Sequence, residues 1–341
     1  MRRRAIPPRP KGRGLSRKLM NGGIFDHLLI SAPNNMGGLY ACSTGRVRSL
    51  DDRPTCGISW SPQNGLLARA IQQGDALSVT TPEDTREYTG DWGDLHDVLL
   101  DGEDIYLVST QHNAVIRWNI PEALEIERRV FAEQEDSWHI NCLGRLRGKL
   151  LFSAFGDFPV TRGYKYATAQ LGFLRELGDG KVSRIRADGL SQPHSILETV
   201  DGAVLCNSET GEVWRAGRDD IFHPFVTLGG YTRGLAIRDG VLYVGLSASR
   251  NASVGQGAMR AQVVAIELSE GQEISRMPLP FTEVYGIVAL PDQTAFLALL
   301  AQVLDGERIR LLRQRNALAE ALAMRTKENV RLKISLGLPV S

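Results

Sequence analysis

Three of the six histidines in this chain open segments that resemble one another. His96, His139 and His194 each precede a short, mostly apolar run, a turn pair and a second apolar run. Random placement of six histidines among 341 residues makes three such matches improbable. The three imidazoles are therefore the first candidates for a functional site.

Three imidazoles that converge on one point can bind zinc and leave an open position for water or substrate. Zinc there could acidify the bound water or polarise a carbonyl. Two other interpretations stay open. The histidines could form a metal-free ligand-binding cluster, or they could hydrogen-bond the loops and ordered water of a wide channel, as buried polar groups generally must.

Further polar and aromatic residues stand at or beside the openings of similar segments. Arg233, in GGYTRGLAI, could hold a carboxylate, sulfate or phosphate through two parallel hydrogen bonds, or form a salt bridge to Asp97. In the metal-dependent alternative, Tyr231 or Asp97 is the acid or base. The candidate ligand-binding residues are His96, Asp97, Trp138, His139, Asn141, His194, Tyr231, Arg233 and Tyr285.

Short strands must position these residues. Between about residues 27 and 300, β-branched and aromatic runs alternate with Gly, Asp and Asn, without a long 3.6-residue periodicity. One four-stranded propeller blade needs about 40–50 residues. The sequence therefore predicts an all-β, six-bladed β-propeller over residues 23–302, with an evenly spaced β-sandwich as the alternative. Six hairpin-like copies, 39 to 55 residues apart, begin at Gly57, His96, His139, His194, Arg233 and Tyr285.

The two ends of the chain complete this prediction. The copy at Tyr285 leaves room for only two strands, so we expect residues 27–45 to complete its blade and close the ring. Residues 303–341 are predicted to be a helical extension, and residues 1–22 a disordered basic tail. Two insertions, 159–181 and 249–260, are expected on one face, where long loops often cap the channel.

Composition excludes several classes of protein. With 43% hydrophobic and 23% charged residues, the chain is typical of soluble globular proteins. It contains no apolar run long enough for a transmembrane segment, and no apolar segment follows the basic N-terminus as in a signal peptide. We therefore expect a cytoplasmic protein with reduced cysteines. Residues 19–302 hold 24 basic and 35 acidic residues, a net charge of −11, which argues against a nucleic-acid-binding surface.

Several motifs resemble those of a bacterial family of uncharacterised propeller-like proteins. The similarity covers residues 90–300 well and residues 27–90 loosely. Members of that family tend to be encoded near, or fused to, glycosyltransferases, sulfotransferases and other surface-polysaccharide functions. The resemblance implies a role in that setting but provides no catalytic residue. The motifs are LHDV (95–98), SWHIN (137–141), GLSQPHS (189–195), NSETGEV (207–213), GGYTRGLA (229–236), YVGLSASR (243–250) and EVYGIVALP (283–291).

Two better-understood six-bladed families match less well. Calcium-dependent lactonases of the regucalcin and gluconolactonase type have Glu, Asn and Asp at blade openings, where this chain has His. Peptidyl-hydroxyglycine lyases hold zinc with histidines, but they are secreted and disulfide-bonded.

The sequence thus favours a propeller, without an assigned cofactor, that binds a glycan, an anionic small molecule, a glycosylated intermediate or a partner enzyme such as a glycosyltransferase in cell-surface polysaccharide biosynthesis. The alternatives are a zinc-dependent hydrolase or lyase that uses His96, His139 and His194, and an interaction scaffold.

Overall fold

The computed structural model describes residues 23–34, 36–178, 185–248 and 260–335. These residues form six four-stranded antiparallel sheets, each an up-and-down meander, and one long helix. The innermost strands of successive blades contact one another in a ring, as in a six-bladed β-propeller, which confirms the predicted fold class. The basic tail and nearly all of the insertion at 249–260 lie outside the described residues.

Five blades are continuous in sequence, and their first strand is the innermost one. The first of these blades contains β4 (Thr55–Ser61), β5 (Leu66–Ile71), β6 (Ala76–Thr80) and β7 (Thr85–Thr89), and the next contains β8 (Leu95–Asp101), β9 (Asp104–Ser109), β10 (Ala114–Asn119) and β11 (Leu124–Val130). The third contains β12 (Ile140–Leu146), β13 (Lys149–Ala154), β14 (Gly172–Glu176) and β15 (Ile185–Leu190). The last two contain β16 (Pro193–Thr199), β17 (Gly202–Asn207), β18 (Glu212–Ala216) and β19 (Phe222–Thr227), then β20 (Tyr231–Arg238), β21 (Val241–Ser247), β22 (Gln262–Glu267) and β23 (Glu273–Pro278).

The sixth blade joins the two ends of the chain. Its innermost strand is β24 (Ile287–Ala289), which pairs with β1 (Leu28–Ala32), followed by β2 (Gly38–Ser43) and β3 (Arg46–Asp51). N-terminal strands therefore close the ring, as predicted. The prediction assigned two strands of this blade to the copy at Tyr285. Instead, three strands come from the N-terminal side of the chain and only one from the C-terminal side.

The helix α1 (Gln293–Ser335) begins ten residues before the predicted start at Val303. The Asp-Gln pair at 292–293, expected to form a hairpin turn, instead begins the helix, and Asp292 Oδ1 accepts a hydrogen bond from the Ala295 amide at 2.9 Å. Phe296, Leu299 and Val303 recur at helical spacing and pack on the core of the closing blade. The second strand expected for the last copy is thus the first part of α1.

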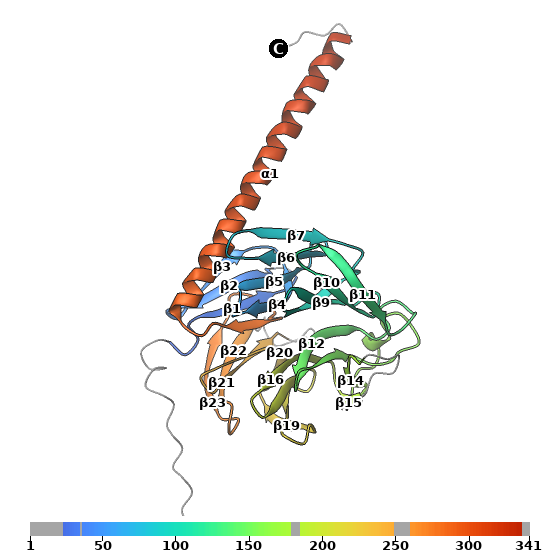
Figure 1. Cartoon of the computed structure of the whole chain (residues 1–341), viewed down its shortest axis with the longest axis vertical. Helices are drawn as coiled ribbons and strands as arrows, with labels where there is room; N and C mark the ends of the chain where they lie inside the picture. Colours follow the sequence, from blue (N-terminus) through green and yellow to red (C-terminus); the bar gives the residue numbers. More distant parts are fainter. Residues whose placement is uncertain (1–22, 35, 179–184, 249–259, 336–341) are drawn as a thin grey trace, which may run out of the picture.

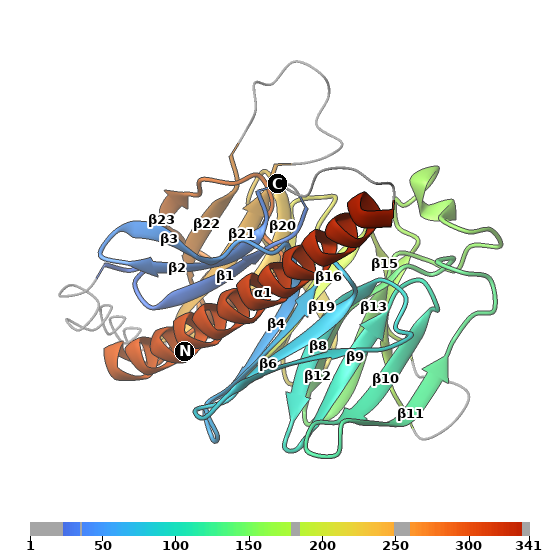
Figure 2. The same ribbon diagram turned by 90° about the horizontal axis from the view of Figure 1, so that it is seen from above.

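The first part of α1 contacts the sheets, with β3, β6 and β7 among its neighbours, and the rest extends beyond them (Figure 1). From above, α1 runs obliquely across the propeller, with β1 to β3 on one side and β4 and β6 on the other (Figure 2). In the described part of the chain, no helix is long and apolar enough to cross a membrane.

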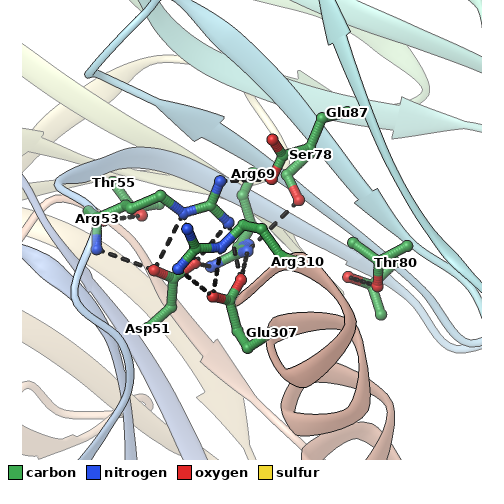
Figure 3. Close-up of polar contacts among 10 residues, drawn as sticks. Asp51, Arg53, Thr55, Arg69, Ser78, Thr80, Glu87, Glu307 and Arg310 are labelled. Atoms are coloured by element: carbon green, nitrogen blue, oxygen red, sulfur yellow. Dashed lines mark hydrogen bonds and ion pairs between the residues drawn. The ribbon is translucent and has the colours of Figure 1, made fainter. Parts of the chain in front are cut away.

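Buried ion pairs attach α1 to the propeller (Figure 3). Asp51 accepts hydrogen bonds at 2.8 Å from Arg53 and from Arg69, which is fully buried. Glu307 of α1 lies 2.8 Å from Arg53 and 2.7 Å from Arg310. Burial alone would raise the pKa of Asp51, but the Arg53 hydrogen bonds and the charge of Arg69 lower it well below its usual value. The helix is therefore held by charges that neutralise one another away from water.

The insertion predicted at 159–181 contains part of a blade. Residues 163–165 form a short 3₁₀ helix, and Gly172–Glu176 form β14, the third strand of its sheet. The insertion that interrupts the blade is therefore shorter than predicted. All four cysteines are buried and free, in line with the expectation of reduced thiols.

Hydroxyl groups join each blade to the next at five of the six junctions. In each case, a Ser or Thr lies at or near the C-terminal end of the second strand of a blade. Its hydroxyl donates to a backbone carbonyl at or near the start of the innermost strand of the following blade. We call these contacts the hydroxyl bridges. They are Ser31 to Cys56 (2.5 Å), Thr110 to Ile140 (2.6 Å), Ser153 to Pro193 (3.3 Å), Ser208 to Thr232 (2.6 Å) and Ser247 to Val284 (3.1 Å). At the sixth junction, Asp75 Oδ1 accepts from the Leu95 amide at 2.5 Å.

A Thr110→Val substitution tests a hydroxyl bridge without changing the shape of the side chain. Thr110 is fully buried, so removing its hydroxyl should lower the free energy of unfolding by about 1–3 kcal/mol. Urea denaturation followed by tryptophan fluorescence measures the change. Thr89→Val, at an exposed position on β7, is the matched control and should be near neutral. Equal unfolding midpoints for the two variants would contradict a stabilising role.

Candidate functional site

Residues at the openings of three innermost strands (β8, β16 and β20), and residues just before two others (β12 and β24), meet at one mouth of the channel. His96 and His139 lie with ring centres 5.3 Å apart, and Tyr285 lies 6.0 Å from His96 and 6.3 Å from His194. His194 in turn lies 5.6 Å from Tyr231. We call this set, with Arg233, the mouth cluster. The structure therefore brings together six of the nine predicted ligand-binding residues: His96, His139, His194, Tyr231, Arg233 and Tyr285.

Arg233 is the cation at the centre of the mouth cluster. Its guanidinium lies 4.8 Å from the ring centre of Tyr285. Nη1 contacts Glu283 Oε2 at 3.3 Å, and Nη2 donates to His194 Nε2 at 3.1 Å. Nε is buried and has no hydrogen-bond partner among the described residues. The predicted salt bridge to Asp97 is wrong, because the carboxylate beside Arg233 belongs to Glu283.

His194 is held as a neutral imidazole. Burial and then the nearby charge of Arg233 lower its pKa well below the usual value. Because Nε2 faces a guanidinium donor, the proton is assigned to Nδ1, which lies 2.9 Å from Ser208 Oγ and 3.0 Å from the Gln192 carbonyl. The ring is therefore fixed on both sides by the protein.

The other two histidines are oriented by carboxylates. His139 Nδ1 lies 2.7 Å from Asp136, and burial lowers the pKa of His139, although Asp136 partly opposes this shift. His96 Nδ1 lies 3.0 Å from Asp94. Tyr164, from the loop after β13, covers His139 at a ring-centre distance of 4.2 Å. That insertion thus caps one side of the mouth, as expected of a long loop.

The mouth cluster does not fit one zinc ion shared by the three histidines. Among the described residues, no group of three His, Cys, Asp or Glu side chains is placed to hold a metal ion. His194 directs one nitrogen at Arg233, and a guanidinium would repel a divalent cation. Phe155 packs against both His139 and His194, at 4.4 and 5.2 Å. The metal site stays a prediction that this arrangement does not favour.

Three predicted residues do not join the mouth cluster. Trp138 is buried in packing, with its ring 5.2 Å from Phe173, so it offers no binding surface in the channel. Asn141 is fully buried, and its carbonyl accepts the Tyr285 hydroxyl at 2.5 Å. Asp97 accepts a hydrogen bond from the Leu143 amide at 2.8 Å and lines the channel beyond Tyr285.

Sequence reasoning missed several residues that support the mouth cluster. Glu283 contacts Arg233 and accepts a hydrogen bond at 3.2 Å from Asn34. Ser208, in the NSETGEV motif, contacts both His194 and the Thr232 carbonyl. Ser208 could have been found by aligning the ends of the second strands, where a hydroxyl recurs.

Elemental analysis of the purified chain tests the zinc alternative. We expect well under one zinc per chain after purification without chelator, because Arg233 faces the imidazole of His194. His194→Ala should leave the metal content unchanged, and His223→Ala, at an exposed position on β19, is the control. Near-stoichiometric zinc that only the His194 variant loses would overturn this expectation.

Comparisons with solved structures show the propeller fold. The structure of a nidogen/laminin complex contains a chain with 14% sequence identity and a TM-score of 0.56, over 77% of this chain and 98% of that one. A calcium-binding protein, regucalcin from Agrobacterium tumefaciens, gives 13% identity and a TM-score of 0.52, over 70% and 79%. A luciferin-regenerating enzyme gives 12% identity and a TM-score of 0.51, over 68% and 78%. At these identities, the likeness concerns the fold alone.

No protein of curated function matches this sequence significantly. A family model does match residues 60–299, which is most of the chain and includes the mouth cluster. The chain therefore belongs to the DUF4915 family, which is defined by a domain of unknown function.

Proposed function

We propose that this propeller binds an acidic glycan or glycosylated intermediate through the mouth cluster, and that it serves cell-surface polysaccharide assembly. The observation that carries the proposal is the buried Arg233 Nε, a donor without an acceptor among the described residues. Buried donors are nearly always satisfied, so this Nε requires an acceptor that a ligand or an ordered water could supply. A carboxylate or sulfate would provide it.

The charge of Arg233 favours an anion over a cation beside its guanidinium. Arg233 is permanently charged, and Glu283 offsets it from one side only, at 3.3 Å. Since His194 stays neutral, it adds no second charge but accepts from Arg233 and so orients the guanidinium. A bound carboxylate would receive a charge-assisted hydrogen bond in a partly dry site, where such bonds are strong.

The aromatic side chains suit the apolar face of a sugar ring. Tyr231 and Tyr285 lie beside Arg233, and Tyr164 covers the neighbouring His139. Aromatic rings with a polar edge combine apolar contact area with hydrogen-bonding capacity. The Tyr285 hydroxyl is already used by Asn141, and that of Tyr231 donates to Gln192 at 2.6 Å. The tyrosines are therefore rigid walls.

The polysaccharide setting rests on the resemblance of motifs such as SWHIN and GGYTRGLA to a family encoded near glycosyltransferases. The match to DUF4915 and the propeller fold are compatible with that setting. A glycosyltransferase or a related enzyme would be the natural partner. We propose a cytoplasmic location, where sugar donors and lipid-linked intermediates are available.

Calorimetric titration with glucuronate, galacturonate and their oligomers tests the proposal, with glucose as the neutral control. The intact chain should bind an acidic sugar and not glucose. Arg233→Gln should weaken binding of the acidic sugar at least tenfold, about 1.4 kcal/mol. The affinity of Arg233→Lys should lie between those of the intact chain and Arg233→Gln, because lysine keeps the charge but loses the paired N–H donors of the guanidinium.

Arg276→Gln is the matched control, since this arginine lies at the outer strand β23 and pairs with Glu273. It should bind as the intact chain does. Circular dichroism should show the same fold for all variants. Equal affinity for glucuronate in the Arg233 and Arg276 variants would remove the mouth cluster as the binding site.

A further inference from the structure

A second cavity lies further along the same channel. Its volume is about 310 Å³, at the lower end of the range for small-molecule sites. Its lining starts at Tyr285 and continues down the innermost strands, away from the openings that carry the histidines. Tyr285 belongs to both sites, and its hydroxyl is fixed to the Asn141 carbonyl. The tyrosine therefore separates the mouth cluster from this cavity, which we call the channel cavity.

The wall of the channel cavity is aliphatic. Each blade contributes at least one aliphatic side chain from its innermost strand, and the first of these lies one to four positions after the blade opening. These residues are Ile58, Val98, Leu143, Ile196, Leu235 and Ile287. Such a ring offers apolar contact from all sides to a ligand on the axis.

One carboxyl group interrupts this apolar wall. Asp97 Oδ2 accepts the Leu143 amide at 2.8 Å. Oδ1 lies over Gly57 so closely that a Cβ at position 57 would stand 2.0 Å from it, so only glycine fits there. None of the ion pairs found among the described residues includes Asp97. Burial raises the pKa of Asp97 to about 7, as expected for a carboxyl without a cationic partner.

We propose that the channel cavity binds a small primary ammonium ion with an aliphatic chain, and that the ammonium group pairs with Asp97. An ionised carboxylate in an apolar cavity is costly unless a cation neutralises it, and the ligand would provide that cation. The aliphatic ring would cover the chain of the ligand. This site shares Tyr285 with the mouth cluster but centres on Asp97 and not on Arg233.

Titration with n-hexylammonium chloride at pH 8 is the test, because Asp97 is then largely ionised. The other titratable groups that face Asp97 are His96 on its own strand, Cys56, Cys142 and Tyr285. The raised pKa values of the two thiols and of Tyr285 keep those three groups neutral at this pH. Hexan-1-ol has the same chain without the charge, and ammonium chloride has the charge without the chain.

The intact chain should bind hexylammonium at least tenfold more tightly than hexan-1-ol or ammonium. Asp97→Asn keeps an acceptor for the Leu143 amide but removes the charge, so it should reduce hexylammonium binding to the level of hexan-1-ol. Arg233→Gln, in the mouth cluster, should leave hexylammonium binding in place.

Hexylammonium binding that Asp97→Asn does not weaken, or tighter binding of hexan-1-ol than of hexylammonium, would overturn the proposal. If the Asn variant does not fold, Ala289→Phe replaces it, because Ala289 lines the cavity and a phenyl ring would fill it. Unchanged hexylammonium binding in that variant would place the ion elsewhere and equally overturn the proposal.

Discussion

The positions of the blades around the channel depend on the hydroxyl bridges. These hydrogen bonds hold the innermost strand of one blade against the second strand of the blade before it. These hydrogen bonds lie beside the starts of the innermost strands. They therefore fix the position of each opening residue around the channel axis. Pairing of β24 with β1 closes the ring. Side chains from positions as distant as 96 and 285 can then pack with ring centres 6.0 Å apart.

Desolvation decides the chemistry of the two sites that this ring creates. In the mouth cluster, burial and the charge of Arg233 keep His194 neutral. Beyond Tyr285, burial instead raises the pKa of Asp97, because aliphatic side chains surround it. One tyrosine thus separates Arg233 from Asp97 within a single channel.

The sequence predicted the parts of this account that depend on local pattern. Polar residues at the start of apolar strands, such as His96 and Arg233, are conspicuous, and hairpin spacing predicts the blades. Contacts between residues that are distant in sequence, and that only the closed ring of blades brings together, were not predictable. The partner of Arg233 is Glu283, 50 positions away. The Asp292–Gln293 pair suits both a turn and a helix start, and only the packing of Phe296 against the closing blade decides between them.

The central claim is that Arg233 offers its unpaired Nε to an anionic ligand at the channel mouth. A crystal structure of the full chain grown with glucuronate tests it most directly. The account predicts the sugar carboxylate within hydrogen-bonding distance of Arg233 Nε, with the sugar ring against Tyr231 or Tyr285. Arg233 Nε bound to a group of the protein itself, with glucuronate absent from the mouth or bound elsewhere, would contradict it.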